Sequence, residues 1–190
     1  MVLECLLRHS PKHFRFFPTE DEGRLNDPRI RENFIVKVFS FYRLQALFKQ
    51  NFSLGALVKF HTQQKFLLLA HSRKHYDTLG QLVAKSKSMG IEILKVKYGE
   101  VFMEALTFKA TPKKNTDVLL HMMGFLKKIL SKEEKKDILS VIEDYRKQLL
   151  PLIVPITLIR HHVSKHKIEY LIGQAYLNPH PKELMLRNHV

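Results

Sequence analysis

The sequence predicts an all-α protein, a single-domain helical bundle of about seven main helices behind an N-terminal arm. Apolar residues recur at helical spacing across residues 28–166, and Ser or Asp residues stand where helix caps are expected. No segment shows the sustained alternation typical of a strand, although residues 91–96 leave a short strand as the weaker option. A chain of 190 residues is long enough to bury one hydrophobic core.

Residues 1–27 differ from the rest of the chain and are interpreted as an arm or linker. They contain two prolines, a glycine and an acidic triplet, which favour turns and extended chain. We expect a short helix within residues 2–7, and we expect Phe14, Phe16 and Phe17 to dock on the body. The helical domain then covers residues 28–190.

The helix boundaries are predicted from capping residues. Asp27 can cap a helix that begins at Pro28, because proline suits the first helical position. Ser53 and Ser72 can cap the next two helices, and Ser131 opens a capping box with Glu134. The further helices are expected at residues 54–70, 73–87, 91–108, 115 or 116 to 130, 132–149, from 152–156 to 166, and 168–177, with a final turn at 182–187.

The net charge is +14, which favours an acidic partner such as a nucleic acid, an anionic surface or an acidic protein. The charge is unevenly distributed, since residues 51–114 hold 11 Lys/Arg and 4 Asp/Glu, a net of +7. A localised basic region indicates phosphate binding better than a uniform one does. An ordinary solvated basic surface is the alternative.

Cys5 is the only cysteine, so one chain cannot build a disulfide, a cysteine zinc site or an iron–sulfur cluster. A single cysteine suits a reducing compartment. No apolar run approaches the roughly 20 residues that span a bilayer. We therefore expect a cytoplasmic protein with no membrane association and no cofactor.

Several helices carry polar residues inside apolar runs, and burying such groups is costly unless they are paired. His61 and Lys65 are one helical turn apart, and His121 lies in a similar run. One interpretation is a shared pocket for anion binding or proton handling; the other is that Lys65 reaches solvent and His61 bonds a nearby carbonyl. The predicted pocket residues are His61, Lys65, His71, His121, Arg160 and His161.

Two histidine pairs have the i, i+4 spacing that metal ligands on one helix can use, His71/His75 and His162/His166. Neither pair encloses the glutamate of the His-Glu-x-x-His motif, and zinc needs three or four converging ligands. Ser72 is expected to break the helix between the first pair. We expect no metal.

Catalytic groups are not evident in the sequence. The helices that would form the pocket are poor in carboxylates, and no Ser–His–Asp or Cys–His arrangement can be recognised. The seven glycines are dispersed, which excludes a glycine-rich phosphate loop. We therefore predict no catalytic residues.

Basic residues instead gather beside aromatic or histidine side chains, a combination that suits RNA with splayed bases. The alternative for each patch is a solvated helix end. The predicted nucleic-acid-binding residues are Arg73, Lys74, Tyr76, Lys109, Lys113, Lys114, Lys127, Lys128 and Arg187.

Several short motifs occur in a characteristic order along the chain. They are residues 53–80, with Phe60-His61, Lys65 and Ala70-His71-Ser72; residues 115–127; residues 151–155 with His161 and His162; and residues 173–188. In this order the motifs resemble the YbgA-like domain, a bacterial domain of unknown function, and the resemblance covers about residues 30–190. Residues 20–35 also resemble the junction found where this domain follows a thiouracil-desulfidase-type domain.

The resemblance implies a function in tRNA modification. Such fusions are implicated in removing sulfur from 2-thiouridine in tRNA, and their desulfidase half holds an iron–sulfur cluster on cysteines. This chain would be the accessory half, which binds tRNA and works with a desulfidase-type domain in cis or in trans. The alternatives are a small independent enzyme or ligand-binding domain that uses the His/Lys pocket, and a module that docks a protein partner.

Overall fold

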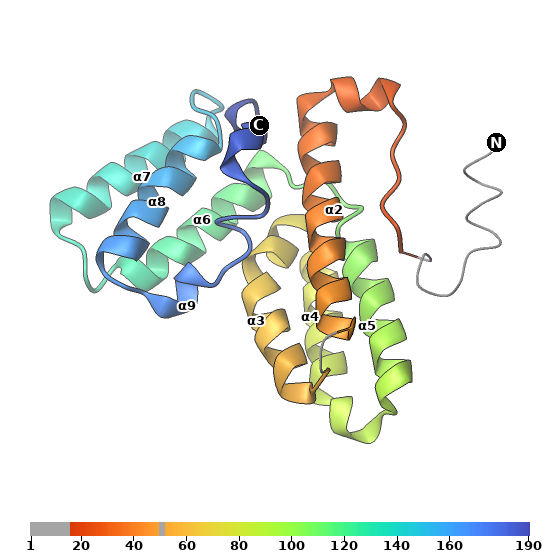
Figure 1. The fold of residues 1–190 in the computed structure, drawn as a ribbon. Helices are drawn as coiled ribbons and strands as arrows, with labels where there is room; N and C mark the ends of the chain where they lie inside the picture. Colours follow the sequence, from red (N-terminus) through yellow and green to blue (C-terminus); the bar gives the residue numbers. More distant parts are fainter. Residues whose placement is uncertain (1–15, 50–51) are drawn as a thin grey trace.

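The computed structural model describes residues 16–49 and 52–190 and confirms the all-α, single-domain prediction (Figure 1). Within these residues there are eight α-helices and no strand, and seven of the helices have 12 or more residues. The α-helices are α2 (Pro28–Lys49), α3 (Leu54–His71), α4 (Arg73–Ala84), α5 (Ile91–Ala105), α6 (Pro112–Leu126), α7 (Lys132–Arg146), α8 (Ile153–Lys165) and α9 (Glu169–Ile172).

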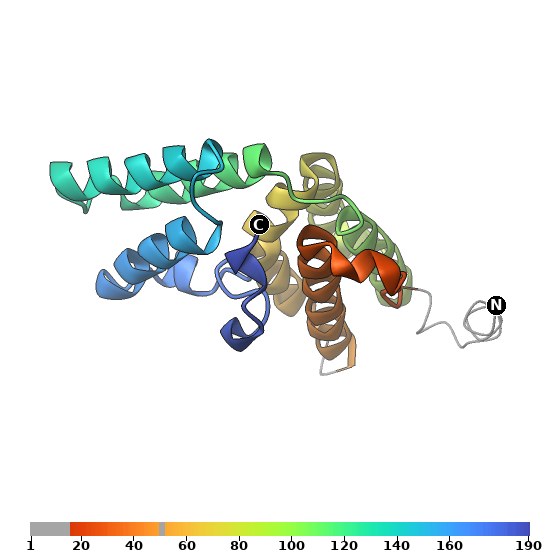
Figure 2. The same ribbon diagram turned by 90° about the horizontal axis from the view of Figure 1, so that it is seen from above.

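The helices form two groups that share one core. Helices α2 to α5 run side by side in one group, and α6 to α8 form the other (Figures 1 and 2). Helix α3 contacts α6 and so joins the groups. The chain after α9, with the short 3₁₀ turns η4 (Lys182–Leu184) and η5 (Leu186–Asn188), returns between them, and η5 contacts α2.

The predicted helix caps are confirmed. The Asp27 carboxylate accepts the backbone N–H groups of Arg29 and Ile30 at 2.8 and 3.2 Å. Ser53 and Ser72 cap α3 and α4 through their hydroxyl groups, and Ser131 forms the full capping box with Glu134 at the start of α7. Capping depends on contacts within one helical turn, so the local sequence was sufficient to predict these caps.

The start of α6 was predicted wrongly. The helix begins at Pro112, with Thr111 as its cap, and not at Asn115 or Thr116. Proline at the first helical position and a threonine before it are good start signals in their own right. Asn115 and Thr116 are instead buried inside α6, where Asn115 bonds tyrosines of other segments and the Thr116 hydroxyl donates to the Pro112 carbonyl of the same helix.

Other boundaries differ by a few residues. Helix α4 ends at Ala84 and is followed by a 3₁₀ turn, η3 (Ser86–Ser88), and α9 is a single turn. Helix α7 ends at Arg146 because Gln148, two residues later, has a φ of 60°, which a right-handed helix does not allow. Residues 91–96 are helical within α5, so the strand option was wrong.

Residues 16–27, the described part of the arm, pack on the outside of the first helix group. The Phe17 and Phe41 rings meet edge-on at 5.7 Å, and Phe16 packs against the hydrophobic core near Gly99. Both phenylalanines therefore dock as expected. The expected helix at residues 2–7 and Phe14 lie outside the described residues.

Helix α2 follows a short 3₁₀ turn, η2 (Gly23–Asn26), and lies beside α3, α5 and η5. Its buried positions include Val36 and Leu44 but also two polar residues, Glu32 and Ser40.

None of the helices in the described part of the chain is long and apolar enough to cross a membrane.

Candidate functional site

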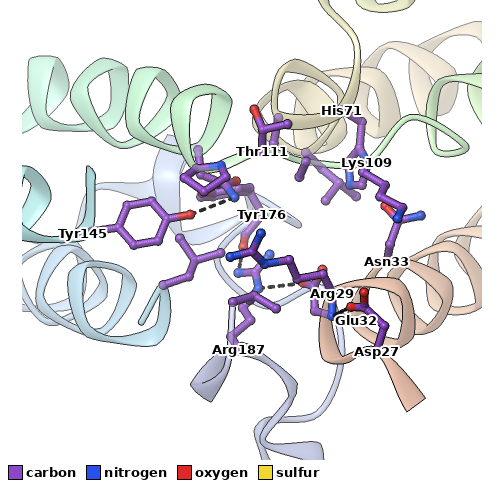
Figure 3. Close-up of a pocket in the computed structure, with 17 residues that line it drawn as sticks. Asp27, Arg29, Glu32, Asn33, His71, Lys109, Thr111, Tyr145, Tyr176 and Arg187 are labelled. Carbon is purple, nitrogen blue, oxygen red and sulfur yellow. Dashed lines mark hydrogen bonds and ion pairs between the residues drawn. The ribbon is translucent and has the colours of Figure 1, made fainter. Parts of the chain in front are cut away.

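A cavity of about 230 Å³, called here the polar cavity because of the charged side chains in its partly apolar wall, opens where the two helix groups meet the C-terminal segment (Figure 3). Charged side chains of both signs line it, and they come from distant parts of the sequence. The charged residues are Asp27, Arg29 and Glu32 at the start of α2, Lys109 before α6, and Arg187 in η5. Such a mixed-charge cavity can hold a small polar molecule or ordered water.

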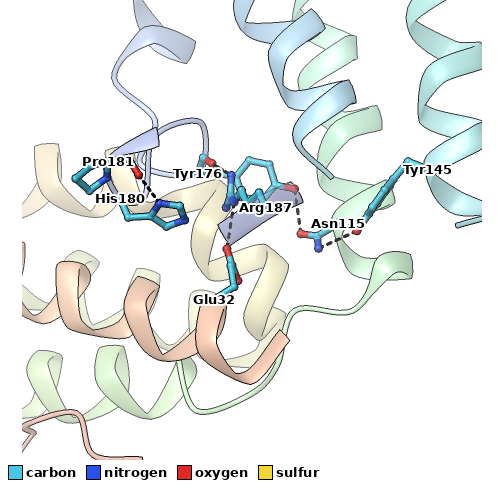
Figure 4. Close-up of polar contacts among 7 residues, drawn as sticks. All are labelled: Glu32, Asn115, Tyr145, Tyr176, His180, Pro181 and Arg187. Carbon is cyan, nitrogen blue, oxygen red and sulfur yellow. Dashed lines mark hydrogen bonds and ion pairs between the residues drawn. The ribbon is translucent and has the colours of Figure 1, made fainter. Parts of the chain in front are cut away.

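A buried ion pair forms one wall of the cavity (Figure 4). Arg187 is only 5% exposed and Glu32 only 7%, and the Arg187 Nε donates to Glu32 Oε1 at 3.1 Å. The same guanidinium donates to the Tyr176 carbonyl at 2.7 Å and lies over the Tyr176 ring. Arg187 therefore stabilises the interior and is not part of an exposed basic surface, unlike the role predicted for it.

Asn115 connects two buried tyrosines at the back of the cavity (Figure 4). The Tyr176 hydroxyl donates to Asn115 Oδ1 at 3.0 Å, and Asn115 Nδ2 donates to the Tyr145 hydroxyl at 3.2 Å. Burial raises the pKa of Tyr176 and of Tyr145, so both hydroxyls stay protonated at neutral pH. The network joins α6, α7 and the segment after α9.

His71 and Lys114 secure the end of α3 beside the cavity. His71 is buried, and its Nδ1 donates to the Phe108 carbonyl at 2.7 Å. Burial lowers the pKa of His71 and outweighs the opposite effect of that hydrogen bond. The Lys114 Nζ donates to the His71 carbonyl at 2.6 Å, so this predicted RNA-binding lysine has a structural contact.

A second candidate feature is a partly exposed set of aromatic rings, called here the stacking surface, formed by His121 and Phe125 of α6 and Tyr170 of α9. The His121 and Phe125 rings stack with centroids 5.8 Å apart, and Phe125 stacks on Tyr170 at 5.1 Å. Buried Phe66 contacts all three rings edge-on and supports them. Phe125 and Tyr170 remain 38% and 37% exposed, so ring surface is open to solvent.

Positive charge lies next to the stacking surface. The Lys65 Nζ is 5.4 Å from the centre of the Phe66 ring. Burial, followed by the charges of Lys65 and Arg73, lowers the pKa of His121. His121 is therefore mainly neutral at pH 7, and Lys65 and Arg73 supply the charge at this surface.

The predicted pocket residues do not line one cavity. Lys65 and His121 both lie beside the Phe66 ring, whereas His61 stacks on Tyr76 at 5.2 Å and shares a hydrogen bond with Tyr98. His71 lines the polar cavity described above. Arg160 bonds the Asn178 side chain and His161 is exposed, both on α8.

Most of the predicted nucleic-acid-binding residues are exposed. Six of the nine are exposed to solvent: Arg73, Lys74, Lys109, Lys113, Lys127 and Lys128. Lys114 and Tyr76 are half-buried, and Arg187 is buried.

Phe125 and Tyr170 of the stacking surface could not be singled out from the sequence, because an aromatic residue at helical spacing more often belongs to the core.

The two histidine pairs behave differently. Ser72 ends α3 and caps α4, so His71 and His75 lie on separate helices, as expected. His162 and His166 stay at the end of α8, with parallel rings 6.2 Å apart. Glu134 of α7 lies beside them; the sequence pointed to this residue only as part of the capping box and not as a neighbour of the histidines.

Together, the fold and these features define an all-α single-domain protein with a polar cavity and a basic, aromatic surface. The chain belongs to the family described as "Protein of unknown function (DUF1722)", which matches residues 65–181. It is also 27% identical over 165 residues to the protein of Escherichia coli (strain K12) described as "Uncharacterized protein YbgA". That match covers 86% of this chain and 98% of the relative, and it confirms the YbgA-like resemblance. No solved structure gives a significant match.

Proposed function

We propose that this protein binds RNA, with tRNA as its target, and serves as the accessory domain in tRNA thiouridine desulfuration. The observation that carries the proposal is the stacking surface next to Lys65 and Arg73. Aromatic faces bordered by positive charge suit single-stranded RNA, whose bases stack while its phosphates are neutralised.

The charge distribution supports the same proposal. Half of the net charge of +14 lies in residues 51–114, and exposed Arg73, Lys74 and Lys113 belong to this stretch. The desulfuration chemistry would come from a desulfidase-type iron–sulfur domain, in cis or in trans, because the chain has one cysteine. This partner and the cytoplasmic location belong to the proposal.

The test is a fluorescence titration of labelled tRNA and of a single-stranded RNA with the wild-type protein at two salt concentrations. The double variant Phe125→Leu/Tyr170→Leu keeps apolar cover over Phe66 but removes the π faces. Stacking contributes about 1–3 kcal/mol per base, so affinity should fall by roughly tenfold or more. Tyr42→Leu is the matched control, since Tyr42 is a 73% exposed tyrosine on distant α2.

Equal loss of affinity in the Tyr42 variant would show that binding does not depend on the stacking surface. No binding to any RNA at low salt would refute the proposed function. It would favour a second candidate, binding of a small polar ligand, for which the cavity walled by Arg29, Lys109 and Arg187 provides the site.

A further inference from the structure

The start of α7 and the end of α8 bring three potential metal ligands together. Glu134, His162 and His166 each offer a ligand atom, and these atoms all lie within 4.8 Å of one another. The histidines are 4 residues apart at the end of α8, whereas Glu134 comes from the first turn of α7. Glu134 is thus a third potential ligand, which the i, i+4 spacing of the two histidines could not reveal.

Two ring nitrogens of this cluster are buried without a hydrogen-bond partner, His162 Nδ1 and His166 Nε2. His162 is only 6% exposed. Buried polar atoms in folded proteins are normally satisfied, so two orphaned nitrogens beside one carboxylate need an explanation. A bound cation would satisfy both at once, because a neutral imidazole offers its unprotonated nitrogen as a metal ligand.

The carboxylate is already held in place. Glu134 Oε2 accepts the Ser131 backbone N–H at 2.9 Å as part of the capping box. The other oxygen, Oε1, lies 3.9 Å from His162 Nδ1 and accepts Lys165 Nζ at 2.9 Å. The Lys165 side chain is 51% exposed, so it can turn into solvent when a cation takes its place.

We propose that Glu134, His162 and His166 bind one divalent transition-metal ion of the zinc class. Two imidazole nitrogens and one carboxylate oxygen suit zinc, and three protein ligands leave one position for water. Zinc holds such ligands at about 2.0–2.2 Å, so the three side chains close in by small torsional changes. The ion then ties α7 to α8.

The site is separate from both features described above. The stacking surface lies on α6 and α9, and the polar cavity lies beside α2 and the C-terminal segment. None of the three proposed ligands lines that cavity. The proposal therefore does not depend on RNA binding.

The test uses the full chain, freed of metal by dialysis against a chelator and then titrated with zinc alone. Calorimetry and elemental analysis should give one tightly bound zinc per chain, and zinc should raise the midpoint of thermal unfolding. Cobalt(II) in place of zinc should give the intense visible absorption of a four-coordinate ion.

Three variants locate the ion. Glu134→Gln keeps an acceptor for the capping box but removes the charge, and His166→Ala removes a half-buried ligand. Each should weaken zinc binding by more than about tenfold and abolish the thermal shift. His161→Ala, an exposed histidine on the same helix, should bind as the wild type does.

Failure of the wild-type chain to bind one equivalent of zinc would overturn the proposal. Zinc binding that survives both Glu134→Gln and His166→Ala, or that falls equally in His161→Ala, would also overturn it, because the ion would then be held by scattered surface histidines.

Discussion

Arg187 and Glu32 are 155 residues apart in the chain, yet they form a buried ion pair at 3.1 Å that ties the C-terminal segment to the first turns of α2. Both side chains are almost fully removed from solvent. The pair links η5, which contains Arg187, to α2, which contains Glu32. Both residues also line the polar cavity (Figure 3).

Removing one member of this pair should be strongly destabilising. Glu32→Gln leaves the buried Arg187 charge uncompensated, and the free energy of unfolding should fall by about 3–5 kcal/mol in urea denaturation. The double variant Glu32→Leu/Arg187→Met should recover part of this loss, because it leaves no unpaired charge. A double variant less stable than Glu32→Gln would contradict this account. Glu143→Gln, which breaks an exposed pair with Arg146, should have little effect.

Asn115→Ala should destabilise the protein more than Tyr145→Phe does. The alanine variant leaves the buried hydroxyls of both Tyr145 and Tyr176 without Asn115, at a cost of about 1–3 kcal/mol for each unsatisfied group. The phenylalanine variant leaves only one Asn115 N–H unpaired. Denaturant unfolding of both variants measures the difference. Equal destabilisation would mean that water in the cavity already satisfies the hydroxyls.

Stability should fall as the pH is lowered from 7 to 5, partly because of His71. Burial holds the pKa of folded His71 below its ordinary value of 6.5, so below that pH the unfolded chain binds a proton that the folded chain does not. The contribution of His71 to the free energy of unfolding is thus fully present above pH 6.5. It is lost as the pH falls below that value, at up to about 1.4 kcal/mol per pH unit. The charge of Glu32 raises the pKa of His71, whereas the charges of Arg187 and Lys114 lower it further.

The matched variant for this pH dependence is His71→Asn, which keeps an N–H donor for the Phe108 carbonyl but does not titrate. Thermal unfolding between pH 5 and 8 should show a shallower fall for the variant than for the wild type. If stability fell equally with pH in the variant and the wild type, His71 would not contribute to the pH dependence.

The salt dependence of RNA binding should locate the basic surface. Replacing Arg73, Lys74 and Lys113 with alanine should flatten the dependence of affinity on salt, by roughly 0.7–0.9 in the logarithmic slope for each phosphate that the variant no longer neutralises. Lys114 is left in place because its ammonium group holds the His71 carbonyl.

The control for the basic surface is the alanine variant of Lys132, Lys135 and Lys136, which lie among Glu133, Glu134 and Asp137 on α7. It should change the slope less, because those carboxylates already offset the three lysines. Identical effects of the two triple variants would indicate attraction by diffuse charge alone.

The sequence by itself determined the fold class and most helix starts. Asp27, Ser53, Ser72 and Ser131 act within one turn of their own helices, so the local sequence contains all the information that positions them. The start of α6 was misplaced because Asn115 also suits a cap, and only its burial between two tyrosines shows why it stands inside the helix.

Only the tertiary structure decided which residues meet. The stacking surface combines α6 with α9, the proposed metal ligands combine α7 with α8, and Arg187 finds Glu32 across nearly the whole chain. Helical periodicity gives the face of a residue but not the helix that packs against it. For that reason the sequence placed Arg187 on the RNA-binding surface, whereas packing buries it as an internal partner of α2.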